Sequence, residues 1–354
     1  MIDMVKSLWS KVIQDAQPEV MREDVNIAEW KRIYQGKSDW LDYQEVNVDG
    51  VTRKRTMKTM NSAKLLCQKM ATLIYSEEPN ISGPDALLAV LEDNKFLVNQ
   101  PEDIERGIAL GAQIVKQRVK NGKIKYDYIT ADNFVPLTWD NSGIYEAAFL
   151  DHRVIKGKEY VRVETHKHYY PDVFVDDGEG KPLLDDNDRP IMQRSEEPIG
   201  YEIRNELFRV DQDKMTKVDI SGLMPDIIDY QVVEVLTPLF AYCKNPIANN
   251  QNSTTPVGMS IYGNAKDTLE ALELAFNNMA EAPELCKPRI MVSDKLTRVT
   301  YDSQTGNKKR IFDTQDRVYR TAPMTDDEKQ PIQDLTIPLQ HDPIRRQIQT
   351  LLDI

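Results

Sequence analysis

The spacing of apolar residues changes near residue 110, and this change limits the chain to a mixed fold. Upstream, apolar positions recur at helical intervals and predict helices over residues 4–13, 60–77, 84–96 and 101–110. Downstream, apolar and polar residues alternate and predict strands around the Asn121-Gly122 turn and over residues 144–155, 158–170, 173–175 and 199–209. Helices followed by hairpins indicate a first domain of the α+β class, over roughly residues 1–250.

The last hundred residues follow a different order. A polar loop over residues 245–256 has no apolar period and is the candidate domain boundary. The most regular helix of the chain is predicted for residues 265–285, and a small strand-and-turn module follows over about residues 288–340. A final helix is predicted to begin near His341. The chain stops at Ile354 without a residue that caps a helix, so we expect a fragment, a truncated product or a chain whose remainder is not seen.

The helix predicted for residues 265–285 has an apolar face and a polar face. The apolar face is made of Ala265, Leu269, Leu272, Phe276 and Met279. The polar face is made of Lys266, Glu270, Glu273, Asn277 and Glu281. This pattern alone favours an ordinary surface helix. The order of helix, compact β module and returning helix instead favours a protruding pair of antiparallel helices, which would bury its apolar stripes against copies of itself in a closed ring.

Charge and cysteine content exclude several classes of protein. The chain has 354 residues, 45 Lys and Arg against 57 Asp and Glu, and a net charge of −12, so bulk charge does not indicate a cationic nucleic-acid binder. Three distant cysteines without a CxxC spacing indicate neither a disulfide framework nor a zinc site. Because charges interrupt every apolar stretch and the first residues, we expect no signal peptide and no membrane partner.

Catalytic signatures are missing from the sequence, so we expect neither an enzyme nor a cofactor. No GxGxxG, GxxxxGK[ST], GxSxG or HExxH pattern occurs. His166 and His168 would point the same way from a strand and could hold a metal, although a solvated strand face is favoured. The acidic segment between Asp172 and Arg189 lacks the order of a calcium loop and is interpreted as a charged hairpin tip. Cys67 lies on an apolar helix and is predicted to be a small core residue.

Several separated segments resemble the portal proteins of tailed bacteriophages, in particular those of long-tailed phages of Gram-positive hosts. They are IYQGKSDWLDY at 33–43, MNSAKLLCQKMATLIYSE at 60–77, the stretch 105–144, TPVGMSIYGNAKDTLEALELAFN at 255–277 and IPLQHDPIRRQIQTLL at 337–352. The resemblance implies a wing domain over residues 1–255, a first stem helix within 256–287, a clip over 288–340 and the start of a second stem helix over 341–354. It also implies a C-terminal crown, which this sequence lacks.

The same resemblance implies a structural role in the virion. Portal subunits form a ring, usually of twelve copies, at one capsid vertex, assembled in the host cytoplasm, and double-stranded DNA enters and leaves through its channel. The expected partners are the terminase large subunit, head-completion proteins, and the major capsid and scaffolding proteins. A lumen rich in Glu and Asn would keep the duplex from adhering, because lysines would bind its phosphates.

The resemblance assigns roles to three sets of residues. Those expected to face the channel are Lys266, Glu270, Glu273, Asn277 and Glu281. Those expected to pack stems together are Leu269, Leu272, Phe276, Met279, Ile344 and Ile348. Those expected to contact DNA or an acidic partner from the clip are Lys308, Lys309, Arg310, Arg317 and Arg320, with hairpin solubility as the alternative.

Two other functions stay open from the sequence. The chain could be another ring or baseplate component of a phage or injection particle, without DNA passage. A metal-dependent nuclease that uses the carboxylates of residues 172–188 is the more distant alternative.

Overall fold

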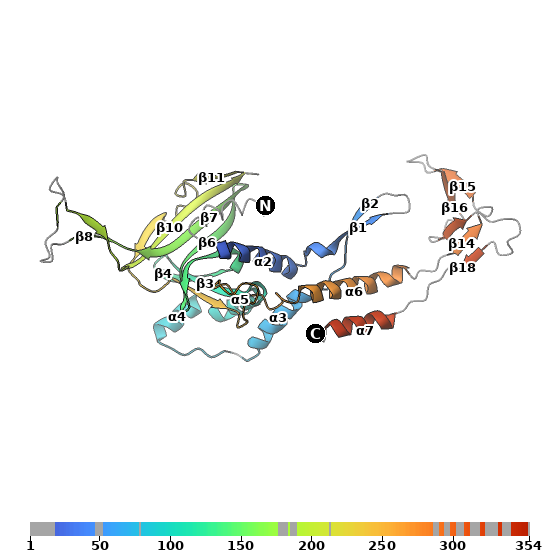
Figure 1. Ribbon diagram of the computed structural model, residues 1–354, viewed down its shortest axis with the longest axis horizontal. Coiled ribbons are helices and arrows are strands. Elements are labelled where there is room, and N and C mark those ends of the chain that lie inside the picture. The colour runs from blue at the N-terminus through green and yellow to red at the C-terminus, as the bar shows by residue number, and fades with distance from the viewer. Residues whose placement is uncertain are drawn as a thin grey trace. The chain divides into compact units, whose positions relative to one another are not determined.

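The computed structural model describes residues 18–46, 52–77, 79–175, 183–184, 190–211, 214–285, 290–293, 298–301, 308–311, 319–322, 332–334 and 341–352. The chain forms two compact units. The first unit comprises Met1–Lys37 and Ala63–Asn264, and the second comprises Ser38–Ser62 and Ala265–Ile354. Helices and strands occur in both, so the predicted α+β class is confirmed (Figure 1). Residues 38–62 belong with the C-terminal part of the chain, which the sequence did not indicate.

The first unit begins with helices. They are α2 (Pro18–Tyr34), α3 (Ser62–Ile74), α4 (Asp85–Asp93) and α5 (Phe96–Leu110). Trp30 and Ile33 of α2 are buried in this unit. Helix α5 begins earlier than predicted, because the φ of Lys95 is positive, at 49°, and separates α4 from Phe96, whose ring packs on Tyr126. The helix predicted for residues 4–13 lies outside the described residues.

A six-stranded antiparallel sheet follows in the order β11-β10-β7-β6-β5, with β12 also paired to β10. Its strands are β5 (Phe134–Asp140), β6 (Gly143–Ile155), β7 (Lys158–Tyr169), β10 (Gly200–Asp211), β11 (Lys214–Val218) and β12 (Tyr230–Val233). The turn between β6 and β7 has positive φ at Lys156 and Gly157, as a two-residue hairpin loop with matching twist requires. The predicted strands of this region are therefore confirmed.

A second, three-stranded sheet has the order β13-β3-β4. Its strands are β3 (Ala112–Lys120), β4 (Lys123–Ile129) and β13 (Phe240–Lys244), and Asn121 and Gly122 form the predicted turn with φ of 53° and 73°. A short hairpin of β8 (Asp172–Phe174) and β9 (Met192–Arg194) extends the first unit further.

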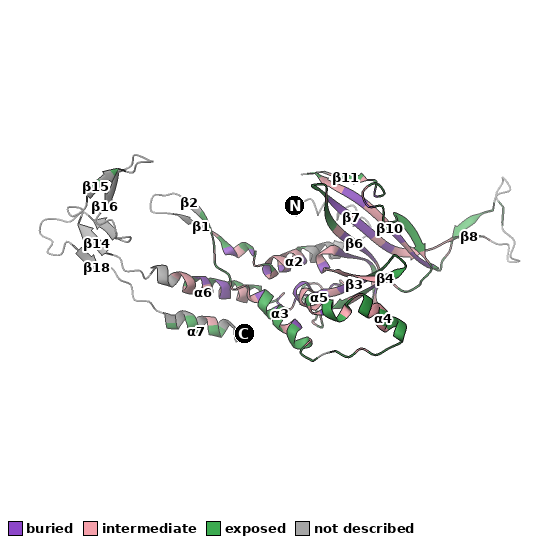
Figure 2. Cartoon of the chain, turned by 180° about the vertical axis from the view of Figure 1, so that it is seen from behind, coloured by how far each residue is buried: buried purple, intermediate pink, exposed green. Residues whose placement is uncertain are grey.

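The core of the first unit lies against both faces of the six-stranded sheet. Figure 2 shows buried positions along β6, β7 and β10. One cluster consists of Val135, Leu137, Ala148, Leu150, Val161, Val163 and Phe208. An aromatic group of Phe134, Phe149 and Phe240 joins this sheet to β13, with ring centroids 5.5–5.8 Å apart. Such offset and edge-on ring contacts are favourable beyond the area they bury.

The loop after β13 packs on the first unit. Asn245 donates from its side chain to the carbonyls of Ile108 and Met259, 3.1 and 2.9 Å away. Gly111 has a φ of 99°, and a Cβ there would lie 2.3 Å from the Gly258 carbonyl oxygen, so only glycine allows this approach. Residues 245–256 form a loop, as predicted, but the two units divide at Asn264 rather than inside it.

The second unit is built around two helices. Its described elements are η2 (Asp39–Leu41), β1 (Asp42–Val46), β2 (Thr52–Thr56), α6 (Lys266–Leu285), β14 (Ile290–Ser293), β15 (Arg298–Tyr301), β16 (Lys308–Ile311), β17 (Tyr319–Ala322), β18 (Ile332–Asp334) and α7 (His341–Leu352). Strand β14 pairs with β17 in parallel and with β18 in antiparallel, and β15 pairs with β16. Helix α7 returns alongside α6 (Figure 1). Among the helices described, none is both long and apolar enough to cross a bilayer.

Candidate functional site

Helix α6 holds the residues that the sequence assigned to the channel, and the structure separates them into two groups. Lys266 and Glu270 are exposed, and Glu281 is half-buried. Glu273 and Asn277 are buried, with 5% and 4% of their surface exposed. The predicted polar face therefore does not lie in solvent as a whole, and the expectation that Glu273 and Asn277 face a channel does not fit their burial.

The two buried polar residues bind the backbone of the segment that follows β2. Glu273 Oε2 accepts a hydrogen bond from the Met60 amide at 2.8 Å, and Asn277 Oδ1 accepts one from the Lys58 amide at 3.1 Å. Glu273 and Asn277 are four residues apart on the helix, which is a rise of about 6 Å. Lys58 and Met60 are two residues apart in extended chain, which spans about 6.6 Å, so the two acceptors match the two amides. Buried polar side chains without a hydrogen-bond partner are costly, so Glu273 and Asn277 favour this position of the segment on α6.

The exposed face of α6 differs from the predicted polar face, because the segment after β2 covers Glu273 and Asn277. The exposed residues are Lys266, Asp267, Glu270, Leu274 and Asn278. Leu274 is 46% exposed, although the sequence pattern did not place it on either face. A lone apolar side chain in a charged face is compatible with a subunit contact as well as with solvent.

The apolar residues expected to pack stems together are covered to different extents within the unit. Leu272 is buried, and Leu269, Phe276 and Met279 are half-buried; helix α6 as a whole contacts α7. Ile348 of α7 is also half-buried. The side chain of Ile344 lies outside the described part, although its backbone belongs to α7.

The basic residues of the predicted clip belong to two strands. Lys308, Lys309 and Arg310 lie on β16, whose register pairs Lys308 with Tyr301 and Arg310 with Val299. Arg320 lies on β17. Arg317 lies outside the described residues. Tyr301 and Val299 of β15 are exposed, so this hairpin presents apolar surface beside its basic strand.

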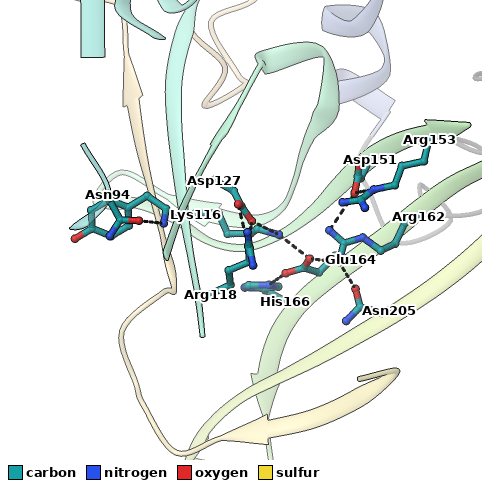
Figure 3. A network of polar contacts seen from close by, with 11 residues as sticks. Asn94, Lys116, Arg118, Asp127, Asp151, Arg153, Arg162, Glu164, His166 and Asn205 are labelled. Carbon is teal, nitrogen blue, oxygen red and sulfur yellow. Dashed lines mark hydrogen bonds and ion pairs between the residues drawn. The ribbon is translucent and has the colours of Figure 1, made fainter. Parts of the chain in front are cut away.

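A charged network with a buried centre links the six-stranded and the three-stranded sheets of the first unit (Figure 3). Lys116 of β3 is 1% exposed, and its Nζ lies 2.6 Å from Glu164 Oε2 on β7. Arg162 Nη1 lies 3.1 Å from the same oxygen, and His166 Nε2 donates to Glu164 Oε1 at 2.8 Å. The network continues through Asp127, Arg118, Asp151, Arg153 and Asn205.

Glu164 is ionised because of these neighbours. Burial alone would raise its pKa, but the hydrogen bond from His166 and the charges of Lys116 and Arg162 hold the pKa well below its ordinary value. A carboxylate that accepts hydrogen bonds from Lys116, Arg162 and His166 has its lone pairs occupied by the protein itself. The arrangement therefore stabilises the junction of the two sheets and offers no open position for a substrate.

The two histidines that could have held a metal have separate partners. His166 is 1% exposed, so the prediction of a solvated strand face is wrong for this residue: the neighbouring sheet covers it. His168 Nδ1 lies 3.2 Å from Glu146 Oε1, and its ring is tilted by 33° against that of Tyr201, with the ring centroids 4.6 Å apart. Within the described ranges, no three His, Cys, Asp or Glu side chains are grouped as metal ligands would be. Most of the acidic segment, residues 176–182 and 185–189, lies outside them.

Cys67 is the core residue that the sequence predicted, with none of its surface exposed. Burial raises the pKa of its thiol to about 12, and the nearby Glu105 carboxylate acts in the same direction. Such a thiol is not a nucleophile near neutral pH.

Comparison with family models settles what kind of protein has this arrangement. The model described as "Phage portal protein, SPP1 Gp6-like" matches residues 20–354. The chain belongs to this family of phage portal proteins. A comparison with curated proteins gives no match. The resemblance drawn from the separated segments is confirmed at the level of the family.

Membership in the portal family gives the chain a structural role. Portal proteins are components of the phage capsid that form an oligomeric ring and take part in DNA passage.

The buried contacts of Glu273 and Asn277 were not found by periodicity, because helical spacing does not show whether a polar face meets water or a neighbouring backbone segment. The segment contributes backbone amides, and backbone donors leave no pattern in the sequence, so no signal for these contacts was available.

Proposed function

We propose that copies of this chain form a ring at one vertex of the capsid of a tailed phage, and that double-stranded DNA is packaged and ejected through it. The single observation that carries the proposal is the portal-family match, which extends over residues 20–354. Ring subunits of this family are usually twelve in number, and we adopt that number. The net charge of −12 supports passage of DNA without adhesion, because a basic lumen would bind phosphates and slow translocation.

The parts of the ring follow the order of the elements. We assign residues 1–255, apart from the segment 57–61, to the wing, α6 to the first stem helix, residues 288–340 to the clip and α7 to the start of the second stem helix. The antiparallel course of α6 and α7, with the small strands between them in sequence, supports this assignment. The segment 57–61 becomes part of the stem, because Glu273 and Asn277 hold it on α6.

The channel surface of the proposed stem includes fewer residues than the sequence pattern predicts. We assign Lys266, Glu270 and Glu281 to it and exclude the buried Glu273 and Asn277. Glu270 would repel passing phosphates, and Lys266 would be an isolated contact to them. Stem packing between neighbours would use Leu269, Phe276, Met279 and Ile348, which the subunit covers only in part.

The clip would dock the terminase large subunit during packaging and head-completion proteins afterwards. The basic strand β16 supports a partner with an acidic surface, with DNA at the channel mouth as the alternative for the same charges. Capsid and scaffolding proteins would contact the wing.

A charge reversal in the phage particle tests DNA passage. Glu270→Lys adds positive charge to the proposed lumen and should slow packaging at low salt without dissolving the ring. Glu92→Lys on α4 makes the same change on the exposed surface of the wing and should leave packaging unchanged. Packaging rates from a motor assay that are equal for Glu270→Lys and wild type would contradict the lumen assignment. Rings that assemble into particles but admit no DNA would favour a baseplate or other structural ring.

A further inference from the structure

Helix α3 buries its small residues and leaves its large apolar residues in solvent. The buried positions, Ala63, Cys67 and Ala71, recur every four residues. The exposed apolar positions are Leu65, Leu66, Leu73 and Ile74, which are 44–58% exposed. Figure 2 shows most of this helix as exposed. Helical spacing places Leu66, Met70, Leu73 and Ile74 on one face; the subunit half-buries Met70 and leaves the other three exposed.

A face of this kind needs an explanation, whereas a single exposed leucine does not. The four large apolar side chains lie on one half of a helix of 13 residues, with Lys69 and the half-buried Met70 between the two pairs, and exposed apolar groups of this kind mark contacts with other chains. The face also has a charge. Lys64 and Lys69 are exposed, and α3 contains no acidic residue. The α3 face, defined here as Leu65, Leu66, Lys69, Leu73 and Ile74, is therefore apolar and basic.

A second exposed surface has the opposite charge. Residues 226–236 include β12 and the turn before it, and their apolar side chains Ile228, Tyr230, Val232, Val235 and Leu236 are 36–63% exposed. The same segment contains Asp226, Asp229 and Glu234, all exposed, and no basic residue. The β12 surface, defined here as residues 226–236, is itself apolar and acidic; the Arg204 guanidinium of β10 lies over the Tyr230 ring, 5.7 Å from its centroid, and 3.9 Å from Glu202.

We propose that the α3 face of one subunit packs on the β12 surface of the next subunit in the ring. This contact rests on the proposed function, since a ring needs two different surfaces on each copy, joined head to tail. The α3 face and the β12 surface meet this need, because they lie on separate elements, both expose aliphatic side chains and carry opposite charge. Apolar contact would supply the affinity, and the charges would select the head-to-tail pairing over the pairing of like surfaces.

Complementary variants test the contact. Leu66→Asp with Leu73→Asp damages only the α3 face, and Ile228→Asp with Leu236→Asp damages only the β12 surface. All four side chains are exposed, so the subunit should fold. Each double variant alone should give monomers by mass photometry where wild type gives rings. An equimolar mixture should give dimers and nothing larger, because one intact α3 face meets one intact β12 surface. Val119→Asp, at a position 75% exposed and outside both surfaces, should still form rings.

A charge exchange provides a second test that does not disturb apolar packing. Lys69→Glu should raise the concentration needed for half-maximal assembly at least about threefold, and adding Glu234→Lys in the same chain should restore it. Double variants that assemble like wild type, or a mixture that stays monomeric, would overturn the contact, as would a wild-type chain that does not associate. Rings that form through this contact but admit no DNA would overturn the proposed function and leave the contact standing.

Discussion

Glu273 on α6 accepts a hydrogen bond from the backbone amide of Met60, 213 residues earlier in the chain, at 2.8 Å. Its carboxylate is 5% exposed, so the bond is made out of contact with bulk water. A charge-assisted bond to an amide is about twice as strong as a neutral one. Together with the bond from Lys58 to Asn277, it joins residues 57–61 to a helix that begins two hundred residues later. The second unit is therefore one structure made from two distant pieces of chain.

Removal of the Glu273 carboxylate should destabilise the second unit. Glu273→Ala removes the acceptor of the amide of Met60, a half-buried residue, which should cost about 1 kcal/mol. Glu270→Ala removes the same groups three residues earlier, from an exposed position, and should change stability by less than about 0.5 kcal/mol. Hydrogen exchange at the Met60 and Lys58 amides measures the effect locally. Equal protection in both variants would contradict the assigned role of Glu273.

The buried ion network should be sensitive to its central carboxylate. Glu164→Gln leaves Lys116 and Arg162 without their shared anion and should cost about 3–5 kcal/mol in the free energy of unfolding. Glu206→Gln breaks only the exposed pair with Lys217 and should cost less than about 1 kcal/mol. Urea unfolding of the two variants measures the difference. A Glu164→Gln protein as stable as Glu206→Gln would show that the network contributes nothing net.

The same carboxylate gives a pH dependence with a defined sign. The pKa of Glu164 is lower in the folded state than its ordinary value of 4.5, so the folded protein holds fewer protons. Its stabilising contribution is therefore complete above about pH 4.5 and is lost as the pH falls toward the folded pKa. The stability gap between wild type and Glu164→Gln should shrink below pH 4.5. A gap that widens in acid would reverse the assignment.

The sequence predicted elements better than faces. The Asn121-Gly122 turn and the α6 helix come from local signals that tertiary contacts do not override, and both are where the pattern places them. The face of α3 is different, because its helical period identifies the Leu66 stripe but cannot say whether the stripe meets its own subunit or another one. Hydrophobicity predicts that the leucines of α3 are buried. The structure instead buries Ala63 and Ala71, because small residues let the helix pack more closely on its neighbours than leucine would.

The predictions for polar residues of the candidate site failed for a related reason. Glu273 and His166 are polar, so the pattern placed both in water, yet each is covered by a segment distant in sequence and has a hydrogen-bond partner there or beside it. A buried polar group is stable when its partner is supplied. Which distant segment supplies it depends on topology, and single-chain periodicity does not encode that.

Thiol labelling should separate two described cysteines. Cys67 is buried, with a pKa raised to about 12, whereas Cys243 is exposed on β13. Because the thiolate is the reactive form, iodoacetamide at pH 8 should modify Cys243 at least about a hundredfold faster than Cys67 in the native protein. Peptide mass spectrometry measures both sites at once. In denaturant the difference should disappear, and a native Cys67 that labels as fast as Cys243 would show that α3 is not packed as described.

Asp103 of α5 should make the first unit less stable as the pH rises through 6. Burial raises the pKa of its carboxyl from 3.8 to about 6 in the folded state, against smaller opposing effects of Gln113 and Arg106. The folded protein thus holds the proton more tightly than the unfolded chain does. The stability that this proton confers is complete below pH 3.8 and is lost as the pH rises to 6 and above. At pH 8 the buried carboxylate is charged, and one of its oxygens, Oδ2, has no hydrogen-bond partner in the described part of the protein.

Replacement of this carboxyl by an amide removes the ionisation and keeps the shape. Asp103→Asn should be more stable than wild type at pH 8, on the order of 1–2 kcal/mol, and the two should converge near pH 4. Asp172→Asn changes an exposed carboxyl on β8 and should follow wild type at every pH. Thermal unfolding between pH 4 and pH 8 measures all three. An Asp103→Asn protein that is less stable than wild type at pH 8 would contradict this prediction. It would mean that neighbouring groups stabilise the charged carboxylate by more than its burial costs.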